Sequence, residues 1–242
     1  MPHHQLVSRD HPLVSRTLVP RALYPPKKKI WFATRSAAAK DPNQVKTHLL
    51  CRACETRFNQ NGESDVLLWV APKAKKEFPL LDTLRKTPAR LTSSDLIVHS
   101  ACDLRLDTDK FAYFALSIVW RAAVNQWLLP DKTVTSLLDL GAPEEPIRRF
   151  LIGDAPFPSD IFVIVVVCTD VLSREHWTAP VPEANCRVYS FLTMGLLFRV
   201  LVGNDTPERF RSCCCRASKG RLVFSTDCRE EMSEILGRLA RM

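Results

Sequence analysis

The chain has 242 residues, of which 46% are hydrophobic and 25% charged, and this is the composition of a globular protein with a substantial core. Seven glycines against seventeen prolines argue against a glycine-rich nucleotide-binding fold. The net charge is +8, and the longest apolar runs, 161–168 and 195–202, are too short to span a bilayer, so no membrane segment is expected.

The first sixty residues carry the whole of the positive excess. They hold eleven Lys and Arg side chains against three acidic ones, whereas the rest of the chain holds twenty-three of each sign. A basic block attracts polyanions because binding releases their counterions, so nucleic acid is an expected partner. Lys27, Lys28 and Lys29 lead into an expected short strand at 30–32. The alternative interpretation is a solvated basic arm without a partner, since such N-termini are common.

Two cysteines follow in the segment His48-Leu-Leu-Cys51-Arg-Ala-Cys54. A Cys-x-x-Cys turn places two thiolates on one tetrahedral zinc ion, which needs four ligands. No second pair lies in the first hundred residues, so His48 is the nearest additional candidate. Cys51, Cys54 and His48 are therefore the candidate metal ligands, with Zn²⁺ as the candidate ion. The alternative is a pair of small buried thiols under a turn.

Further along, the apolar spacing predicts a long helix over 109–129. Asp107 or Thr108 can cap its start. Apolar residues cover more than one side of this segment, so the helix is expected at the centre of the core. Arg121 and Asn125 lie four residues apart and are expected to form a solvent-facing stripe.

A shorter helix over 143–152 precedes a change to strand patterns. The run 161–168 is continuous and β-branched, which predicts a central strand covered on both faces. The segment 186–202 predicts two strands, or one bent strand, with Gly195 at the break. An amphipathic helix over 228–241 is expected to end the chain.

These elements predict an α+β fold with a small knuckle-like N-terminal module, a central buried helix, and a C-terminal, mainly antiparallel sheet with a terminal helix. We divide the chain into a basic segment with the cysteine half-site (1–70), a connecting region (71–106) and an α+β domain (107–242). The nine cysteines are odd in number, three are consecutive at 213–215, and no signal peptide pattern opens the chain. We therefore expect reduced thiols and a cytoplasmic protein.

One stretch resembles a known family. Leu49-Leu50-Cys51-x-x-Cys54-Glu55-x-Arg57-Phe58, followed by Asn61-Gly62-Glu63, resembles the second zinc knuckle of bacterial HNH-endonuclease-like proteins. The segment 16–24 resembles the stretch that carries the histidine of these proteins. The segments 110–121 and 144–151 resemble an uncharacterised bacterial family with the same knuckle. The resemblance implies a zinc-held element, a nucleic-acid partner and, in an active member, metal-dependent endonuclease activity.

The same comparison implies a degenerate member. The histidine that would activate water falls on Thr17, and a threonine cannot act as a general base near neutral pH. The first Cys-x-x-Cys of the family is also missing. His48 and His11 are the remaining candidates for a recruited catalytic base. We therefore expect a nucleic-acid-associated protein without nuclease activity.

Lys27, Lys28, Lys29, Arg52 and Arg57 are the candidate nucleic-acid contacts. The alternative function is that of a non-enzymatic interaction or scaffold protein whose main domain binds a protein partner. This alternative depends on the missing catalytic set and on the apolar character of the strand segments after residue 161. No phosphate-binding glycine loop is present, so no small-molecule cofactor is expected.

Overall fold

A computed structural model describes residues 13–17, 30–33, 38–41, 46–70, 78–93, 95–126, 137–183, 187–203, 206–215 and 222–239. Side chains are described from residue 49 onward, apart from a few single positions. The helices are α1 (Arg52–Phe58), the π-helical turn η2 (Asn59–Glu63), α2 (Ser64–Val70), α3 (Pro79–Lys86), α4 (Thr108–Val124), α5 (Glu144–Ile152), α6 (Val171–Glu175), α7 (Glu208–Arg211) and α8 (Arg229–Leu239).

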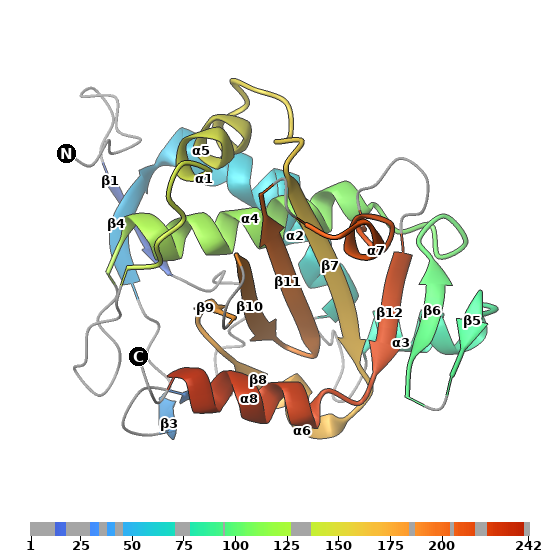
Figure 1. Ribbon diagram of the computed structural model, residues 1–242. Coiled ribbons are helices and arrows are strands. Elements are labelled where there is room, and N and C mark those ends of the chain that lie inside the picture. Colours follow the sequence, from blue (N-terminus) through green and yellow to red (C-terminus); the bar gives the residue numbers. More distant parts are fainter. Residues whose placement is uncertain are drawn as a thin grey trace.

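The strands are β1 (Leu13–Thr17), β2 (Ile30–Ala33), β3 (Ala38–Asp41), β4 (Lys46–Cys51), β5 (Leu91–Thr92), β6 (Ile97–Ser100), β7 (Ile161–Cys168), β8 (His176–Trp177), β9 (Val181–Pro182), β10 (Val188–Thr193), β11 (Leu196–Val202) and β12 (Leu222–Thr226). The main sheet has the order β3-β2-β8-β10-β11-β7-β12-β6-β5, with β9 beside β10 (Figure 1). Its pairs are antiparallel except β12–β7 and β2–β8, which are parallel. The predicted α+β class is confirmed.

The centre of the sheet follows the sequence pattern closely. The predicted strand 161–168 is β7, and it lies between β11 and β12 with seven of its eight residues buried. The segment 186–202 forms the hairpin of β10 and β11. Met194 and Gly195 make its turn with φ of 45° and 84°, a backbone conformation that glycine adopts at no steric cost. The predicted break at Gly195 is therefore confirmed.

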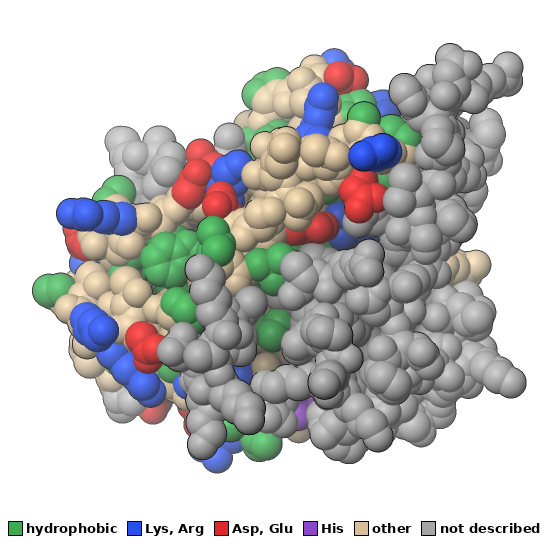
Figure 2. All heavy atoms as spheres, turned by 180° about the vertical axis from the view of Figure 1, so that it is seen from behind, with side chains coloured by type: hydrophobic (Ala, Val, Ile, Leu, Met, Phe, Trp, Pro, Cys, Tyr) green, Lys and Arg blue, Asp and Glu red, His purple; other side chains and the backbone are tan. Residues whose placement is uncertain are grey.

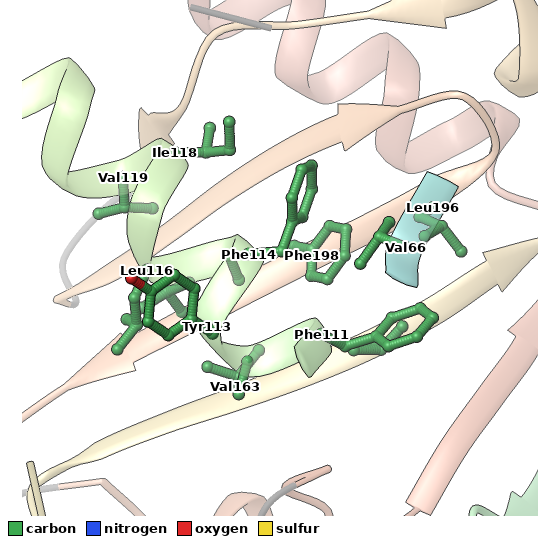
Figure 3. Close-up of a cluster of buried hydrophobic side chains, with 14 of the residues drawn as sticks. Val66, Phe111, Tyr113, Phe114, Leu116, Ile118, Val119, Val163, Leu196 and Phe198 are labelled. Carbon is green, nitrogen blue, oxygen red and sulfur yellow. The ribbon is translucent and has the colours of Figure 1, made fainter. Parts of the chain in front are cut away.

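Helix α4 packs on one face of this sheet and forms the middle of the larger core cluster (Figures 1 and 3). The Asp107 carboxylate accepts a hydrogen bond from the backbone N–H of Asp109 and so caps its start. Within the close-up, Phe114 points from α4 toward Phe198 of β11, with ring centroids 5.6 Å apart. The predicted helix end at residue 129 is wrong, because Asn125 already has an extended backbone and α4 ends at Val124.

The helical run α1–η2–α2 packs against α4 without an intervening layer. At Gly62 an added Cβ would lie only 2.9 Å from the backbone nitrogen of Phe114, so this close approach requires glycine. Phe58 and Val66 belong to the same core cluster as α4. The segment 71–106 includes α3, β5 and β6. The boundaries proposed near residues 70 and 106 remain predictions.

The opposite face of the sheet carries a second apolar cluster. The side chains of Ile164, Leu192 and Leu201 belong to it, and α8 packs against it through Ile235. Helix α7 lies on the same cluster through Phe210. Helix α8 spans 229–239 and confirms the predicted terminal helix as far as the described residues extend. Among the described residues, α4 covers one face of the sheet, and α7 and α8 cover parts of the other.

Candidate functional site

The cysteine pair lies at the junction of a strand and a helix. Strand β1 pairs antiparallel with β4, with Leu13 opposite Cys51 and a register shift between Val14 and Ser15. Strand β4 then passes directly into α1, so Cys51 is both its last residue and the N-cap of the helix. Two antiparallel strands followed by a helix make a ββα unit, and the helix carries Cys54 in its first turn.

The two thiols have different environments. The backbone N–H of Cys54 donates a hydrogen bond to Cys51 Sγ at 3.5 Å. This bond is the main reason that the pKa of Cys51 is lowered from its ordinary value. Burial raises the pKa of Cys54 to about 11, and its hydrogen bond with the Cys51 side chain acts in the same direction. Cys51 is therefore the thiol that ionises first, and a bound cation would be needed to hold both residues as thiolates.

The pair matches half of a zinc site. Zinc in a structural site takes four ligands in a tetrahedron, and two thiolates from one turn are a common half. Among the described side chains, the potential metal ligands that cluster in a group of three are Cys168, Asp170 and Cys228. No third described ligand therefore lies close to both Cys51 and Cys54. His48 lies on β4 opposite Ser15, but its side chain is outside the described part, as is all of His11.

The predicted nucleic-acid contacts divide between described and undescribed residues. Arg52 and Arg57 are exposed on α1. The guanidinium of Arg57 reaches the end of α5, where it lies 2.5 Å from the position a Cβ of Gly153 would take. Lys27, Lys28 and Lys29 lie outside the described residues. On the face shown in Figure 2, Lys and Arg side chains alternate with Asp and Glu over the described surface.

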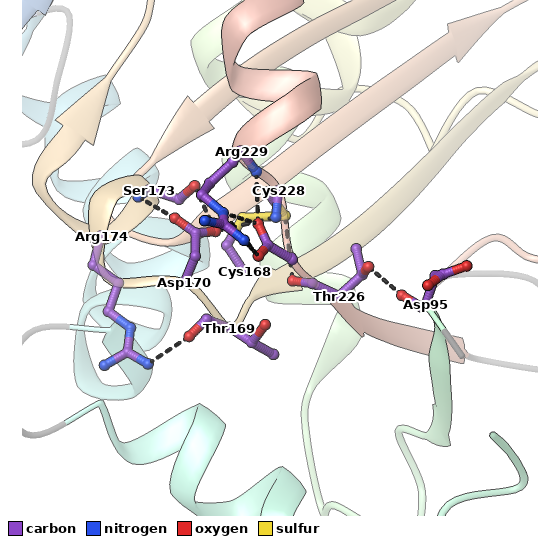
Figure 4. Close-up of a disulfide and its surroundings, with 10 residues drawn as sticks. Asp95, Cys168, Thr169, Asp170, Ser173, Arg174, Thr226, Cys228 and Arg229 are labelled. Atoms are coloured by element: carbon purple, nitrogen blue, oxygen red, sulfur yellow. Dashed lines mark hydrogen bonds and ion pairs between the residues drawn. A yellow bond between two sulfur atoms is a disulfide. The ribbon is translucent and has the colours of Figure 1, made fainter. Parts of the chain in front are cut away.

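A second group of cysteines contradicts the expectation of reduced thiols. Cys168 at the end of β7 and Cys228 before α8 form a disulfide across 60 residues (Figure 4). The parallel pairing of β12 with β7 sets Thr226 opposite Cys168 and thereby brings Cys228 to it. This pairing is a long-range feature, and the spacing of the cysteines in the sequence held no sign of it.

Asp170 organises the same corner. Its carboxylate caps α6 by accepting hydrogen bonds from the backbone N–H and the hydroxyl of Ser173, and it also accepts one from the backbone N–H of Cys228. The donor atoms of Cys168, Asp170 and Cys228 lie within 4.8 Å of one another, so this group has the residue types of a metal site. The sulfurs are bonded to each other, however, and a disulfide offers no thiolate to a metal.

The consecutive cysteines serve packing, as expected of small apolar side chains. Cys214 and Cys215 are buried, and Cys215 belongs to the core cluster of α4. Cys214 Sγ accepts a hydrogen bond from the backbone N–H of Val163. The side-chain hydrogen bond with Cys214 and burial both raise the pKa of Cys215, which keeps this thiol neutral. The structure therefore places these two thiols in the protein interior.

One functional feature of the core was predicted wrongly. Arg121 was expected to face solvent, but its side chain is 2% exposed and forms an ion pair with Glu63, which is 6% exposed. Its guanidinium also lies over the ring of Phe58, 5.2 Å from the centroid. A single arginine on a helix that is apolar all round was the signal available in the sequence. Its partner could not be found there, because Glu63 lies 58 residues away.

No protein-family model, curated protein or solved structure matches this chain. None of the described helices is both long and apolar enough to cross a lipid bilayer. The comparisons thus add no family to the geometry, and the functional argument depends on the ββα unit and its cysteine pair.

Proposed function

We propose that this protein associates with nucleic acid through an HNH-like ββα unit that is held by a structural zinc ion and does not cleave its partner. The observation that carries the proposal is the antiparallel pair β1–β4 leading directly into α1, with Cys51 and Cys54 at the start of that helix. This strand–helix order, with a thiol pair in the first helical turn, is what the resemblance of 49–63 to a zinc knuckle implies.

The thiol pair supports the metal part of the proposal. Cys51 is stabilised as a thiolate by a backbone N–H, and Cys54 shares a hydrogen bond with it. The two remaining ligands of a tetrahedral site would come from residues 1–48, which include His11 and His48. Zinc bound there would join the N-terminal segment to α1. Cys51 and Cys54 must be reduced to bind the ion, and we propose a cytoplasmic location, where a bond such as that between Cys168 and Cys228 is rare.

Charge supports the nucleic-acid part. Arg52 and Arg57 are exposed on the helix that carries the thiol pair, and the lysines at 27–29 belong to the segment that β1 and β4 bracket. Lys and Arg side chains bind the phosphates of a nucleic acid whatever its base sequence. Because this binding releases counterions, its affinity falls as the salt concentration rises. Binding of this kind needs no contact with the bases. We therefore propose that the protein recognises the phosphate backbone of its nucleic-acid partner without sequence specificity.

The absence of a catalytic base in the expected place supports binding without cleavage. Thr17, which takes the place of the family's histidine, is the last residue of β1. A hydroxyl of this kind does not remove a proton from water near neutral pH. The proposed role of the ββα unit is therefore to present basic side chains to a phosphate backbone, with the zinc ion keeping the unit folded.

The first experiment measures zinc in the untagged full chain by mass spectrometry. We expect about one zinc per chain, lost in the Cys51→Ser/Cys54→Ser variant and kept in Cys102→Ser, because Cys102 is an exposed free cysteine away from the pair. Equal zinc in all three proteins, or none in any, would remove the metal from the proposal.

The second experiment measures binding to a fluorescent DNA or RNA duplex as a function of salt. Replacing Lys27, Lys28 and Lys29 by glutamate should weaken binding and lower the salt slope by about three. The matched control reverses three exposed basic residues elsewhere in the chain, Arg85, Lys86 and Arg90. If no duplex binds at low salt, the nucleic-acid proposal fails, and a protein partner of the main domain becomes the function to test.

A further inference from the structure

A large cavity opens on the face of the sheet opposite α4. It has a volume of about 1100 Å³, which is slightly above the usual range for small-molecule sites. Its floor is formed by the side chains of three neighbouring strands, β7, β10 and β11, and Phe210 of α7 forms part of its wall. In Figure 1 this is the face on which α8 lies. The cavity therefore occupies a part of the second apolar cluster that no described helix covers.

The floor of this cavity contains a charge where the strand pattern calls for an apolar residue. Successive residues of β11 point to opposite faces, so Leu197, Arg199 and Leu201 share one face. The two leucines belong to the second apolar cluster. Arg199 stands between them, opposite Ile164 of β7 and Ser190 of β10. A guanidinium in the middle of an apolar sheet face is unusual, because it gains nothing from packing there alone.

The contacts of Arg199 leave most of its hydrogen-bonding capacity unused. Its Nε lies 3.4 Å from Glu183 Oε1, and the hydroxyl of Ser190 donates to the same carboxylate oxygen. The two terminal amino groups of Arg199 have no partner in the described part of the chain, and its side chain is 36% exposed. Those groups form a planar fork of the kind that binds a carboxylate through two hydrogen bonds.

Of the two acidic residues that line the cavity, one contacts Arg199 at Nε and the other lies at a different level of the sheet. Glu183 accepts a hydrogen bond from the Ser190 hydroxyl and forms an ion pair with Nε of Arg199. Asp160 lies at the other end of the cavity. Arg199 pairs with Ile164 in the middle of β7, whereas Asp160 comes just before Ile161, the first residue of that strand, which pairs with Val202. Four residues of strand separate the two levels, which is about 13 Å. Arg187 also lies at that end, where its carbonyl accepts a hydrogen bond from the N–H of Val202.

We propose that this cavity is a binding site for an amphipathic organic anion. A carboxylate would lie on the terminal amino groups of Arg199, and an apolar chain or ring would lie against Ile164, Val188 and Leu201. The pairing of the guanidinium with the carboxylate would orient the ligand, and the apolar wall would supply most of the contact area. The proposal is independent of the ββα unit and of any metal there.

The test uses the full chain and three ligands of one length: decanoate, decanol and decylammonium. Isothermal titration calorimetry should show one decanoate bound per chain, with decanol and decylammonium bound at least about tenfold more weakly, since a hydrogen bond to a charged group is worth that factor or more. Decanol binding as tightly as decanoate would overturn the role of Arg199. The absence of decanoate binding at about 1 mM, the weak end of specific affinity, would overturn the site.

Two variants locate the site. Arg199→Gln should weaken decanoate binding about tenfold and leave decanol unchanged, whereas Arg90→Gln, at an exposed ion pair elsewhere, should change neither. Because Arg199→Gln removes a partner of Glu183, its thermal unfolding is measured alongside. Val188→Trp fills the cavity without changing charge and should abolish binding of both ligands. Unchanged decanoate binding in Val188→Trp would place the ligand elsewhere and overturn the proposal.

Discussion

The carboxylate of Glu63 and the guanidinium of Arg121 form an ion pair inside the core, joining the π-helical turn η2 to the central helix α4. Breaking such a pair leaves a charge in a poorly solvated place, which costs more than the intact pair contributes. The pair also ties the helical run that begins at Cys51 to α4. Loss of this ion pair is therefore expected to shift the helix that carries the cysteine pair relative to α4.

We expect Glu63→Ala to lower the free energy of unfolding by about 3–5 kcal/mol, because the charge of Arg121 is then buried without a partner. Denaturant unfolding measures this change. The double variant Glu63→Leu/Arg121→Met should recover most of the loss. The control is Glu145→Ala, which breaks an exposed pair with Arg148 and should cost about 0–1 kcal/mol. If Glu63→Ala and Glu145→Ala lowered stability by the same amount, the ion pair between Glu63 and Arg121 would not be the buried pair described above.

The close approach of η2 to α4 leads to a second prediction. Gly62→Ala places a methyl group 2.9 Å from the backbone nitrogen of Phe114, so the two segments must separate. We expect a loss of about 1–3 kcal/mol in unfolding free energy, as for other overpacked cores. Thr56→Ala on the exposed face of α1 serves as the control and should change stability by less than about 0.5 kcal/mol. A stabilised Gly62→Ala protein would show that the helices pack less closely.

The raised pKa of Tyr113 leads to a prediction of how the stability of the protein depends on pH. Burial raises its pKa from 10.0 to about 12, and its hydroxyl donates to the carbonyl of Leu151 at 2.6 Å. A raised pKa in the folded protein means that the neutral phenol is favoured by folding. This contribution is complete below pH 10 and is lost as the pH rises toward 12.

Unfolding in denaturant between pH 9 and pH 12 tests this dependence. Tyr113→Phe should cost about 1 kcal/mol at neutral pH, for the lost hydrogen bond, and should show a smaller fall in stability above pH 10. Cys54, with a pKa of about 11, contributes in the same direction in metal-free protein and remains in the variant. An identical alkaline fall in both proteins would assign the titration to other groups.

The disulfide predicts a dependence on reducing agent. Loss of the bond between Cys168 and Cys228 frees a loop of about sixty residues in the unfolded chain. We expect Cys168→Ser/Cys228→Ser to lower the unfolding free energy by about 2–4 kcal/mol. Dithiothreitol should lower the stability of the wild type by a similar amount and leave the double variant unaffected. Cys102→Ser is the control, and a wild type that is insensitive to reductant would show that the bond does not form.

Several elements were predictable from the sequence because their causes are local. The β-branched run 161–168 became β7 over the same residues, and Gly195 broke the next segment because a positive φ suits glycine. The helix α5 was expected over 143–152 and ends at Ile152, where Gly153 caps it with φ of 85°. The end of α4 was placed too late, because apolar spacing continued after the backbone had become extended at Asn125.

Some features of the candidate site were likewise predictable from local sequence, and others depend on long-range contacts. Cys51 and Cys54 are three residues apart, so their placement on one turn followed from the sequence alone, and Arg52 and Arg57 are exposed beside them. The pairing of β1 with β4 that makes the ββα unit is a contact across the intervening segment, and no local pattern specifies it. Whether His48 joins the pair is a question of side-chain direction, which spacing does not determine.

Local propensity, capping and alternation are properties of neighbouring residues, and for this reason the sequence by itself determined the α+β class, the central helix and the middle strands. Only the tertiary structure decided which distant residues meet. It paired Arg121 with Glu63 and Cys168 with Cys228, and it placed Arg199 on the floor of a cavity. Each of these contacts depends on the order and register of elements that are far apart in the chain, and that order is set by the packing of the whole core.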